Sequence, residues 1–397
     1  MHPADEIRGI KSKKLFKKRI VIGVTGSIAA VESIKLSREL IRHGADVYPV
    51  MTKAATKIIH PDSLEFATSH KPIIELTGQT EHVSFCGLIK DPVDLLLIAP
   101  CTANTISKIA FGIDDTPVTT FATTAIGSGI PIVIVPAMHL SMFNHKVVQN
   151  NIKKCKSMGI LFVEPVLNGK KAKISSIDEI VANVIRTTGK QDLANKKILV
   201  IGGATAESID DIRIITNRSS GKTAIALANN AFERGAHVEL WYGYSKEKVP
   251  SYLSAKNFET VEDLLNLLNN NNLNFDVIII CAAIADYIPK KLKGKIPSGK
   301  NKLDLELSTA PKIIKKIRPV APKAKIIAFK AEQNKIDLKK RAYQILEENQ
   351  LDFVIGNTIS AFGKDENEIL IINKKGESTH KKGKKEELAN YILNTVK

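Results

Sequence analysis

Short hydrophobic runs alternate with amphipathic stretches along the chain. The run "RIVIGVTGS" over residues 19–27 is rich in β-branched residues and leads directly into a glycine-containing turn. The following stretch, up to Gly44, places its apolar residues at helical spacing, and a second apolar run follows that glycine. Further buried-strand patterns cover residues 94–99 and 131–138. Strands and helices that alternate in this way predict a parallel α/β domain.

The same pattern restarts near residue 196. The segment "KILVIGGAT" (197–205) predicts a strand followed by a glycine turn, and a helical pattern then ends at Gly235 before another strand. The segment "DVIIICAAIADY" (276–287) predicts a further buried strand and parallels "DLLLIAPCTANT" in the first half. The chain is therefore predicted to repeat one architectural plan twice without close sequence repetition.

We assign the chain to the α/β class, with two Rossmann-like, doubly wound domains. The polar stretch 186–197 separates the two patterns, so the predicted domains cover residues 1–190 and 191–397. Ligands of doubly wound sheets bind at the carboxyl ends of the strands. Each glycine turn and each polar loop after a strand is therefore part of a candidate site.

Charge favours small anionic ligands over nucleic acid. The 397 residues include 58 Lys plus Arg against 41 Asp plus Glu, a net charge of +17. The basic residues are spread along the chain, and aromatic residues make up only 5% of it, so platforms for base stacking are scarce. A basic surface that attracts anionic substrates is the better interpretation, and no nucleic-acid partner is expected.

The sequence also predicts a cytoplasmic protein without a membrane partner. No run of eighteen uncharged apolar residues is present, and the basic N-terminal segment lacks the apolar core of a signal peptide. The four cysteines form no CxxC pair and no zinc-binding spacing: Cys86, Cys101, Cys155 and Cys281. A reducing compartment and the absence of a structural metal are therefore expected.

The first glycine turn is a candidate phosphate site. Gly26 and Ser27 precede a predicted helix, whose N-terminus suits a phosphate, although a purely structural turn is an equal alternative. The turn lacks the full GxGxxG pattern, and "YPVMTKAA" (48–55) supplies no acidic residue at the end of the second strand. A nicotinamide dinucleotide is therefore disfavoured.

Polar residues follow two later strands of the first half. "PCTANT" (100–105) offers Thr102, Asn104 and Thr105 as hydrogen-bonding groups, and "PAMHLSMF" (136–143) ends the next strand. His82 is expected in a loop before the strand at 94–99, where an ordinary surface or core role is the alternative to catalysis.

Together, these segments resemble the flavin-dependent cysteine decarboxylases, whose patterns are PASANT and PxMNxxMW. The resemblance covers residues 19–175 and implies a flavodoxin-like domain that binds FMN. His82 would be the base that assists oxidation of the substrate thiol, after which the carboxylate can leave as CO2. The implied FMN contacts are Gly26, Ser27, Ile28, Thr52, Lys53, Ala54, Thr102, Ala103, Asn104, Thr105 and Ala137.

The chain departs from that family at two places. His139 replaces the asparagine that grips the substrate carboxylate, and it could donate the same hydrogen bond. The segment "EPVLNGKKAKISS" (164–176) replaces the family's glycine-rich clamp with its proton-donating cysteine. Cys155 is near in sequence but lacks the glycine pattern, so we interpret it as structural. The proton donor therefore has no assignment from sequence.

In the second half, "ITNRSSGKTA" (215–224) raises the question of a P-loop. A P-loop needs a glycine five positions before Gly221, and Thr216 occupies that position. The segment instead resembles the SNRSSGKMG signature of phosphopantothenate–cysteine ligases, as "AAIADY" resembles their AAVADY. The resemblance covers nearly all of 196–397. Ser219, Ser220, Gly221 and Lys222 would then hold substrate or nucleotide phosphate, and Asn217 the acyl group.

Three further ligase residues follow from this resemblance. Lys295 would bind the triphosphate, and Asp286 and Phe329 would contact the nucleotide. Taken alone, they would be interpreted as a solvated lysine, a helix cap and a core residue, respectively. Later lysines of the family cannot be aligned uniquely here. The alternatives are Lys339, Lys340 and Arg341.

The order of the two halves is that of the fused coenzyme A biosynthetic enzymes. The resemblance implies ligation of cysteine to 4′-phosphopantothenate, followed by FMN-dependent decarboxylation of 4′-phosphopantothenoylcysteine to 4′-phosphopantetheine. CTP is the expected nucleotide, with ATP as the alternative, and Mg²⁺ is the expected metal, with no ligands assigned. The family also implies a homo-oligomer of trimeric decarboxylase units linked by ligase dimers.

Two other functional classes fit parts of the sequence. A flavin-binding regulatory protein is the main alternative, because relatives of the decarboxylase domain act as regulatory partners. The intact ligase half and the absence of an acidic tail argue against it. A nicotinamide oxidoreductase is disfavoured by the incomplete glycine pattern.

Overall fold

The computed structural model describes residues 2–169, 171–297, 302–332, 335–358 and 366–397. The chain divides into two compact units, Met1–Gly189 and Lys190–Lys397. Each unit has its own hydrophobic core on both faces of a central sheet. No helix in the described part of the chain is long and apolar enough to cross a bilayer.

The first unit is built on a five-stranded parallel sheet with the order β2-β1-β3-β4-β6. This is the flavodoxin-like order, whose switch point lies between the first strand and the third. Its strands are nearly continuous apolar runs because helices cover both faces. The bounds are β1 (Arg19–Val24), β2 (Asp46–Met51), β3 (Leu95–Cys101), β4 (Ile132–Pro136) and β6 (Leu161–Phe162).

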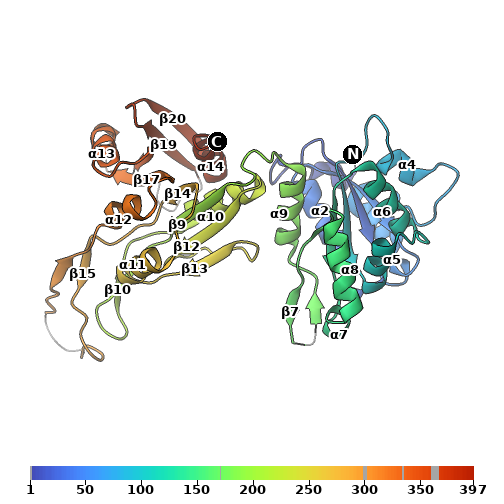
Figure 1. Cartoon of the computed structure of the whole chain (residues 1–397), viewed down its shortest axis with the longest axis horizontal. Helices are drawn as coiled ribbons and strands as arrows, with labels where there is room; N and C mark the ends of the chain where they lie inside the picture. The colour runs from blue at the N-terminus through green and yellow to red at the C-terminus, as the bar shows by residue number, and fades with distance from the viewer. Residues whose placement is uncertain (1, 170, 298–301, 333–334, 359–365) are drawn as a thin grey trace. The chain divides into compact units, whose positions relative to one another are not determined.

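Two layers of helices enclose this sheet (Figure 1). One face is covered by α2 (Glu32–Arg42), α3 (Pro61–Thr68) and α9 (Ile177–Thr188), the other by α5 (Ala103–Phe111), α6 (Pro117–Ser128) and α8 (Lys146–Ser157). The shorter elements are α1 (Pro3–Glu6), η1 (Ile28–Val31), η2 (Ala55–Lys57), α4 (Glu81–Cys86) and α7 (Leu140–Phe143). A three-stranded antiparallel sheet is formed by β5 (Met138–His139), β8 (Lys171–Lys173) and β7 (Val166–Asn168).

The second unit contains an eight-stranded sheet with the order β13-β12-β9-β14-β17-β18-β19-β20. Its first six strands are parallel and follow the dinucleotide-binding order 3-2-1-4-5-6, which places the switch point between β9 and β14. The bounds are β9 (Lys197–Gly202), β12 (His237–Tyr242), β13 (Ser254–Asn257), β14 (Val277–Ile280), β17 (Lys325–Glu332), β18 (Phe353–Thr358), β19 (Glu366–Asn373) and β20 (Ser378–Lys384).

Helices also cover both faces of this sheet. One face packs against α10 (Lys222–Glu233) and α14 (Lys385–Asn394), and the other against α11 (Val261–Asn270), α12 (Ile313–Val320) and α13 (Lys335–Glu348). Two small hairpins pair β10 (Ala206–Ser208) with β11 (Ile214–Thr216) and β15 (Tyr287–Pro289) with β16 (Leu307–Thr309). The hairpin that contains β15 extends away from the sheet of its unit (Figure 1).

The prediction of two doubly wound α/β domains is confirmed, and the structure differs from the sequence-based expectation at three places. The strand predicted for 276–287 ends at Ile280, because Ala283 bonds to the loop after β9 instead of to a neighbouring strand. His82 lies in helix α4 instead of a loop, since the amides of Val83 and Ser84 donate to the Thr80 carbonyl. Finally, β19 and β20 add an antiparallel edge that was not predicted from the sequence.

The second unit should lose stability in acid through Asp192. Hydrogen bonds from Arg234 and Lys397 lower the pKa of Asp192 from 3.8 to about 2. The folded state therefore binds fewer protons than the unfolded state, so the stabilisation is present above about pH 4 and is lost as the pH falls toward 2. We expect Asp192→Asn to lower the melting temperature at about pH 6, by a difference that shrinks toward pH 3.

The matched control is Asp304→Asn. Asp304 forms an ion pair with Lys302 in which both side chains are about four-fifths exposed, and exposed pairs contribute little. Its melting temperature should follow that of the wild type at every pH. A constant difference between Asp192→Asn and the wild type across this range would contradict the assignment.

Candidate functional site

In the first unit, the loops after the strands meet at the carboxyl edge of the sheet. A Cβ on Gly26 would lie 2.6 Å from the Cβ of Ala54, so only glycine allows these two loops to approach so closely. The Ser27 hydroxyl donates to the Ala137 carbonyl at 3.2 Å, and the Ala137 amide donates to the Cys101 carbonyl at 3.1 Å. The edge is therefore one connected surface built from four loops.

A cavity of about 650 Å³ opens at this edge. Four residues predicted from sequence line it: Ser27, Ile28, Ala137 and His139. The other walls come from the start of α2, from β8 and from the first turn of α9, including Glu32, Lys171, Lys173, Ser175 and Ile177. Residues 171–176, recognised in the sequence only as part of a departure from the family (164–176), therefore form part of the candidate site.

The threonine-rich loop after β3 is ordered by hydrogen bonds within the unit. The Thr102 amide donates to the Thr25 hydroxyl at 3.0 Å, and the hydroxyls of Thr102 and Thr105 are 3.1 Å apart. Thr102 caps α5, Ala103 and Thr105 are buried, and Asn104 is exposed. These four residues lie at the carboxyl edge but do not line the cavity, and the same holds for Gly26, Thr52, Lys53 and Ala54.

His82 is not brought to the cavity of its own chain. It lies on α4, which packs against α6, and it is absent from the cavity wall. Its Nδ1 atom is nevertheless buried without a hydrogen-bond partner. A buried imidazole nitrogen usually has a partner, so this atom is unsatisfied within the described part of the chain.

Cys155 is buried between α5 and α8, and its thiol contacts the Ile106 carbonyl at 3.9 Å. Burial raises the pKa of the Cys155 thiol to about 11. Cys155 does not line the cavity. These observations agree with the structural role interpreted from sequence.

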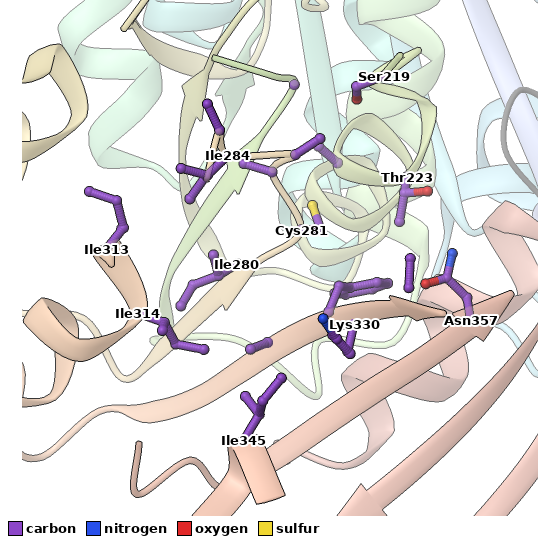
Figure 2. Close-up of a pocket in the computed structure, with 18 of the residues that line it drawn as sticks. Ser219, Thr223, Ile280, Cys281, Ile284, Ile313, Ile314, Lys330, Ile345 and Asn357 are labelled. Atoms are coloured by element: carbon purple, nitrogen blue, oxygen red, sulfur yellow. The ribbon is translucent and has the colours of Figure 1, made fainter. Parts of the chain in front are cut away.

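In the second unit, a cavity of about 550 Å³ lies where β9, β14 and β17 end (Figure 2). Five residues predicted from sequence line it: Ser219, Ser220, Gly221, Asp286 and Phe329. Figure 2 shows Ser219 and Thr223, near the start of α10, across the cavity from Ile313 and Ile314 of α12. The cavity therefore has a polar wall and an apolar wall.

One buried threonine connects the loops around this cavity. The Thr205 hydroxyl accepts from the Ala285 amide at 2.9 Å, and the Thr205 carbonyl accepts from the Thr216 hydroxyl at 2.8 Å. The Asn217 amide nitrogen donates to the Ala283 carbonyl at 3.1 Å, which fixes the orientation of this side chain. Asn217 is thus held beside Ala283, a residue of the cavity wall.

Gly221 caps α10 in the left-handed backbone region, with φ of +77°. A Cβ at this position would lie 1.9 Å from the Tyr242 hydroxyl oxygen. Lys222 begins the helix, but its side chain does not line the cavity. This turn therefore requires glycine. The N–H groups of the first turn of α10, which have no partner within the helix, follow it, and this arrangement suits a phosphate.

Lysines gather around the cavity from several elements. Asp286 forms an ion pair with Lys312. Lys315 and Lys330 also line the wall, and the ammonium of Lys330 lies 3.2 Å from Glu332. These three lysines were not predicted from the sequence. The position of Lys312 directly before an amphipathic helix, after "STAP", was the one available signal.

Cys281 also lines this cavity. Its thiol donates to the Ile201 carbonyl at 3.4 Å, and burial raises the pKa of the thiol to about 12. The thiol is therefore protonated at neutral pH and is no candidate nucleophile.

Lys295 lies apart from the cavity of its own chain. Its loop is attached to the β10–β11 hairpin, because the Ile296 amide donates to Asp210 at 2.9 Å and the Gly294 amide to Asp211 at 3.0 Å. The side chain of Lys295 is exposed and does not line the cavity. The alternatives left open from sequence do not line it either: Lys339 and Lys340 are exposed, and Arg341 pairs with Glu332.

Within the described residues, no group of three or more His, Cys, Asp or Glu side chains converges to hold a metal ion. Mg²⁺ commonly binds through phosphates, water and only one or two carboxylates, so its binding does not require such a group.

Replacing Gly221 with alanine should destabilise the second unit. The left-handed backbone and the overlap with Tyr242 together predict a loss of about 2–4 kcal/mol in unfolding free energy. Thermal unfolding of the Gly221→Ala variant and the wild type measures this loss of stability. Gly127→Ala is the control, because Gly127 lies inside helix α6 with no atom within 4 Å of the added Cβ, and it should be neutral or stabilising. Equal behaviour of the two variants would show that the turn at Gly221 does not require glycine.

Two family models match the chain. One, described as "Flavoprotein", matches residues 8–189, and the other, described as "DNA/pantothenate metabolism flavoprotein C-terminal domain", matches residues 193–397. The flavoprotein assignment made from sequence to the first half is thereby confirmed.

Three curated relatives, each a "Coenzyme A biosynthesis bifunctional protein CoaBC", match over 98–99% of their own length. The protein from Thermococcus kodakarensis is 44% identical over 100% of this chain and 99% of its own. The Methanocaldococcus jannaschii protein is 38% identical over 100% of this chain and 98% of its own. The Borreliella burgdorferi protein is 32% identical over 95% of this chain and 98% of its own. The chain therefore belongs to the family of bifunctional coenzyme A biosynthesis proteins.

Proposed function

We propose that the chain catalyses two consecutive reactions of coenzyme A biosynthesis. The second unit would join cysteine to 4′-phosphopantothenate with CTP, and the first would decarboxylate 4′-phosphopantothenoylcysteine to 4′-phosphopantetheine. The observation that carries the proposal is full-length similarity to bifunctional proteins, combined with a separate cavity at the strand ends of each unit. A regulatory flavin-binding protein would not require the second cavity.

The lining of the second cavity suits the ligation. The carboxylate of 4′-phosphopantothenate attacks the α-phosphate of CTP, and the bond to pyrophosphate breaks. The amine of cysteine then attacks the acyl carbon, loses a proton and displaces CMP. Several anionic groups meet in these steps, and the lysines at 312, 315 and 330 and the start of α10 would stabilise them. Asn217 would hold the acyl group.

Mg²⁺ and Lys295 would act on the triphosphate. We propose that Mg²⁺ binds the nucleotide phosphates, which requires no cluster of protein carboxylates. Lys295 lies outside the cavity of its own chain, so it would act after its loop moves or on the site of a second ligase unit. The second alternative corresponds to the dimeric ligase arrangement predicted from sequence.

The first cavity suits FMN. Its wall combines the Ser27 hydroxyl with apolar surface from Ile28 and Ile177, and the close contact between Gly26 and Ala54 keeps side chains out of the adjoining turn. We propose that the predicted FMN-contacting residues surround the cofactor in the assembled protein. FMN supplies the redox chemistry that makes the β-carboxylate labile.

In the decarboxylation, two histidines of this chain would act on the substrate, one on its thiol proton and one on its carboxylate. His82 would accept the proton of the substrate thiol, and His139 would donate a hydrogen bond to the carboxylate. Since His82 lies away from the cavity of its own chain, neighbouring copies in a trimer would complete the site. We place both reactions in the cytoplasm, with small molecules as substrates and with neither membrane nor nucleic acid as a partner.

A direct test is incubation of the full chain with 4′-phosphopantothenate, cysteine, Mg²⁺ and either CTP or ATP, followed by mass analysis. We expect 4′-phosphopantetheine with CTP and a yellow protein with flavin absorption. Turnover with ATP alone would overturn the nucleotide assignment, and a colourless, inactive chain would overturn the whole proposal.

His82→Asn should abolish CO2 release while ligation continues, because asparagine cannot accept the thiol proton. We expect 4′-phosphopantothenoylcysteine to accumulate and the flavin spectrum to persist. The ligation rate, measured in the same sample, is the internal control for folding. Decarboxylation near the wild-type rate would show that His82 is not the base.

Two further variants should separate the steps of ligation. Lys295→Gln removes the charge that neutralises the leaving pyrophosphate, so little acyl-nucleotide should form. Asn217→Asp should slow the attack of cysteine more than activation, so acyl-nucleotide should accumulate. Quenched reactions with labelled 4′-phosphopantothenate measure the intermediate. If neither variant accumulates it and both lose nucleotide binding equally, the division of roles is wrong.

A further inference from the structure

We propose that Lys171 binds the substrate carboxylate together with His139, and so distinguishes substrate from product in the first unit. This inference rests on the decarboxylase function proposed above. Its starting point is the small sheet β5-β8-β7, in which β5 and β8 run antiparallel with His139 opposite Lys171 and Met138 opposite Ala172. Residues directly opposite each other on antiparallel strands place their side chains on one face, with Cβ atoms about 5 Å apart.

Both strands contribute to the cavity wall, β5 through Met138 and His139 and β8 through residues 171–173. His139, Lys171 and Lys173 are exposed, whereas Ala172, between the two lysines, is only 1% exposed. The exposed polar groups that these strands give to the cavity are therefore on the face that carries His139 and Lys171. One wall of the cavity therefore presents an imidazole and two ammonium groups.

The hydrogen bonds of His139 determine which of its two ring nitrogens carries the proton and can donate to a ligand. The Ser141 amide donates to Nδ1 of His139 at 3.4 Å, and the Ser141 hydroxyl is 2.9 Å from the same atom. A backbone amide can only donate, so Nδ1 accepts and the ring proton lies on Nε2. His139 thus offers an N–H donor to the cavity even when its ring is neutral.

The positive charge of Lys171 is not neutralised within the described part of the chain. Neither Lys171 nor Lys173 forms an ion pair or side-chain hydrogen bond with another described residue. Glu32 is the acidic residue of the same wall, and its carboxylate lies 3.7 Å from the ammonium of Lys35. An anion bound at this wall would therefore lie near two lysines without ion-pair partners and near one acidic residue, Glu32, that is already paired with Lys35.

A further polar group of the cavity also lacks a partner. Ser175 lines the cavity and is 3% exposed, and its buried hydroxyl has no hydrogen-bond partner. Buried hydroxyls are nearly always hydrogen-bonded. A polar ligand that occupies the cavity would satisfy it, which supports a ligand site on this wall independently of the lysines.

A carboxylate fits the pair His139 and Lys171 better than a phosphate does. Their Cβ atoms are at the spacing of cross-strand neighbours, so both side chains can reach one group, and a carboxylate offers two oxygens in one plane to two such donors. The substrate carries this group and the product does not. A site that grips the carboxylate therefore binds substrate tightly and releases product once CO2 has left.

The test compares substrate and product on the full chain. We expect Lys171→Gln to lower kcat/KM for 4′-phosphopantothenoylcysteine by about 10- to 100-fold, the loss of one charge-assisted hydrogen bond. The dissociation constant of 4′-phosphopantetheine, measured by calorimetry, should change less than about twofold, because the product lacks the carboxylate. A parallel loss for substrate and product would mean that Lys171 binds the shared phosphate, and this would overturn the carboxylate assignment.

Conservative variants separate a binding role from a structural one. Lys171→Arg should keep most of kcat/KM, since arginine retains the charge and two donors. His139→Asn should also keep most of kcat/KM, because the asparagine amide can donate to the carboxylate and its oxygen can cap α7. His139→Ala should lose kcat/KM, because alanine can do neither. If Lys171→Arg is as impaired as Lys171→Gln, the charge is not what matters and the inference fails.

Lys153→Gln is the matched control, an exposed lysine of α8 that does not line the cavity. It removes the same charge and should leave kcat/KM unchanged. If the wild-type chain releases no CO2, the proposed function is wrong and the carboxylate site falls with it. If the wild type is active and Lys171→Gln matches it, only this inference is overturned.

Discussion

Thr205 forms the connection on which the geometry of the second cavity depends. Its side chain is fully buried at the end of β9. Its hydroxyl accepts from the loop after β14 and its carbonyl accepts from the segment before α10, so one residue joins three loops that are far apart in sequence. Together with the bond from the Asn217 side chain to the Ala283 carbonyl and the backbone bond from the Ala283 amide to the Gly203 carbonyl, these bonds hold the segment before α10 in place at the strand ends. In parallel sheets such loops are not held by the ladder itself, and side-chain bonds of this kind are what orders them.

Features that depend on neighbouring residues could be predicted from the sequence. The buried strands, the glycine turns and the separation into two doubly wound domains follow from local patterns, and Ser219–Gly221 and Asp286 lie together because strand ends share one edge. Features that depend on distant segments could not. The lysines at 312, 315 and 330 reach the cavity only through the packing of α12 and β17, and the pairing of His139 with Lys171 depends on the register of two short strands. No local pattern encodes either arrangement.

The net charge of +17 is known from the sequence, but only the fold shows which basic residues lie at the cavities. A few of the 58 basic residues line the two cavities, and each cavity combines them with apolar surface. Cations beside low-dielectric walls act more strongly on an anion than cations in open solvent do. The remaining basic residues contribute a diffuse potential that attracts anionic metabolites without selecting among them.

The Cys281 thiol has a consequence for an enzyme whose proposed substrate is free cysteine. Desolvation raises its pKa to about 12, so the group stays a thiol at neutral pH. Disulfide exchange proceeds through the thiolate, so the cavity wall is slow to form mixed disulfides with cystine or with oxidised cysteine derivatives. Alkylating reagents should spare this position for the same reason. The second unit can thus handle a reactive thiol without its own thiol becoming a target of adduct formation.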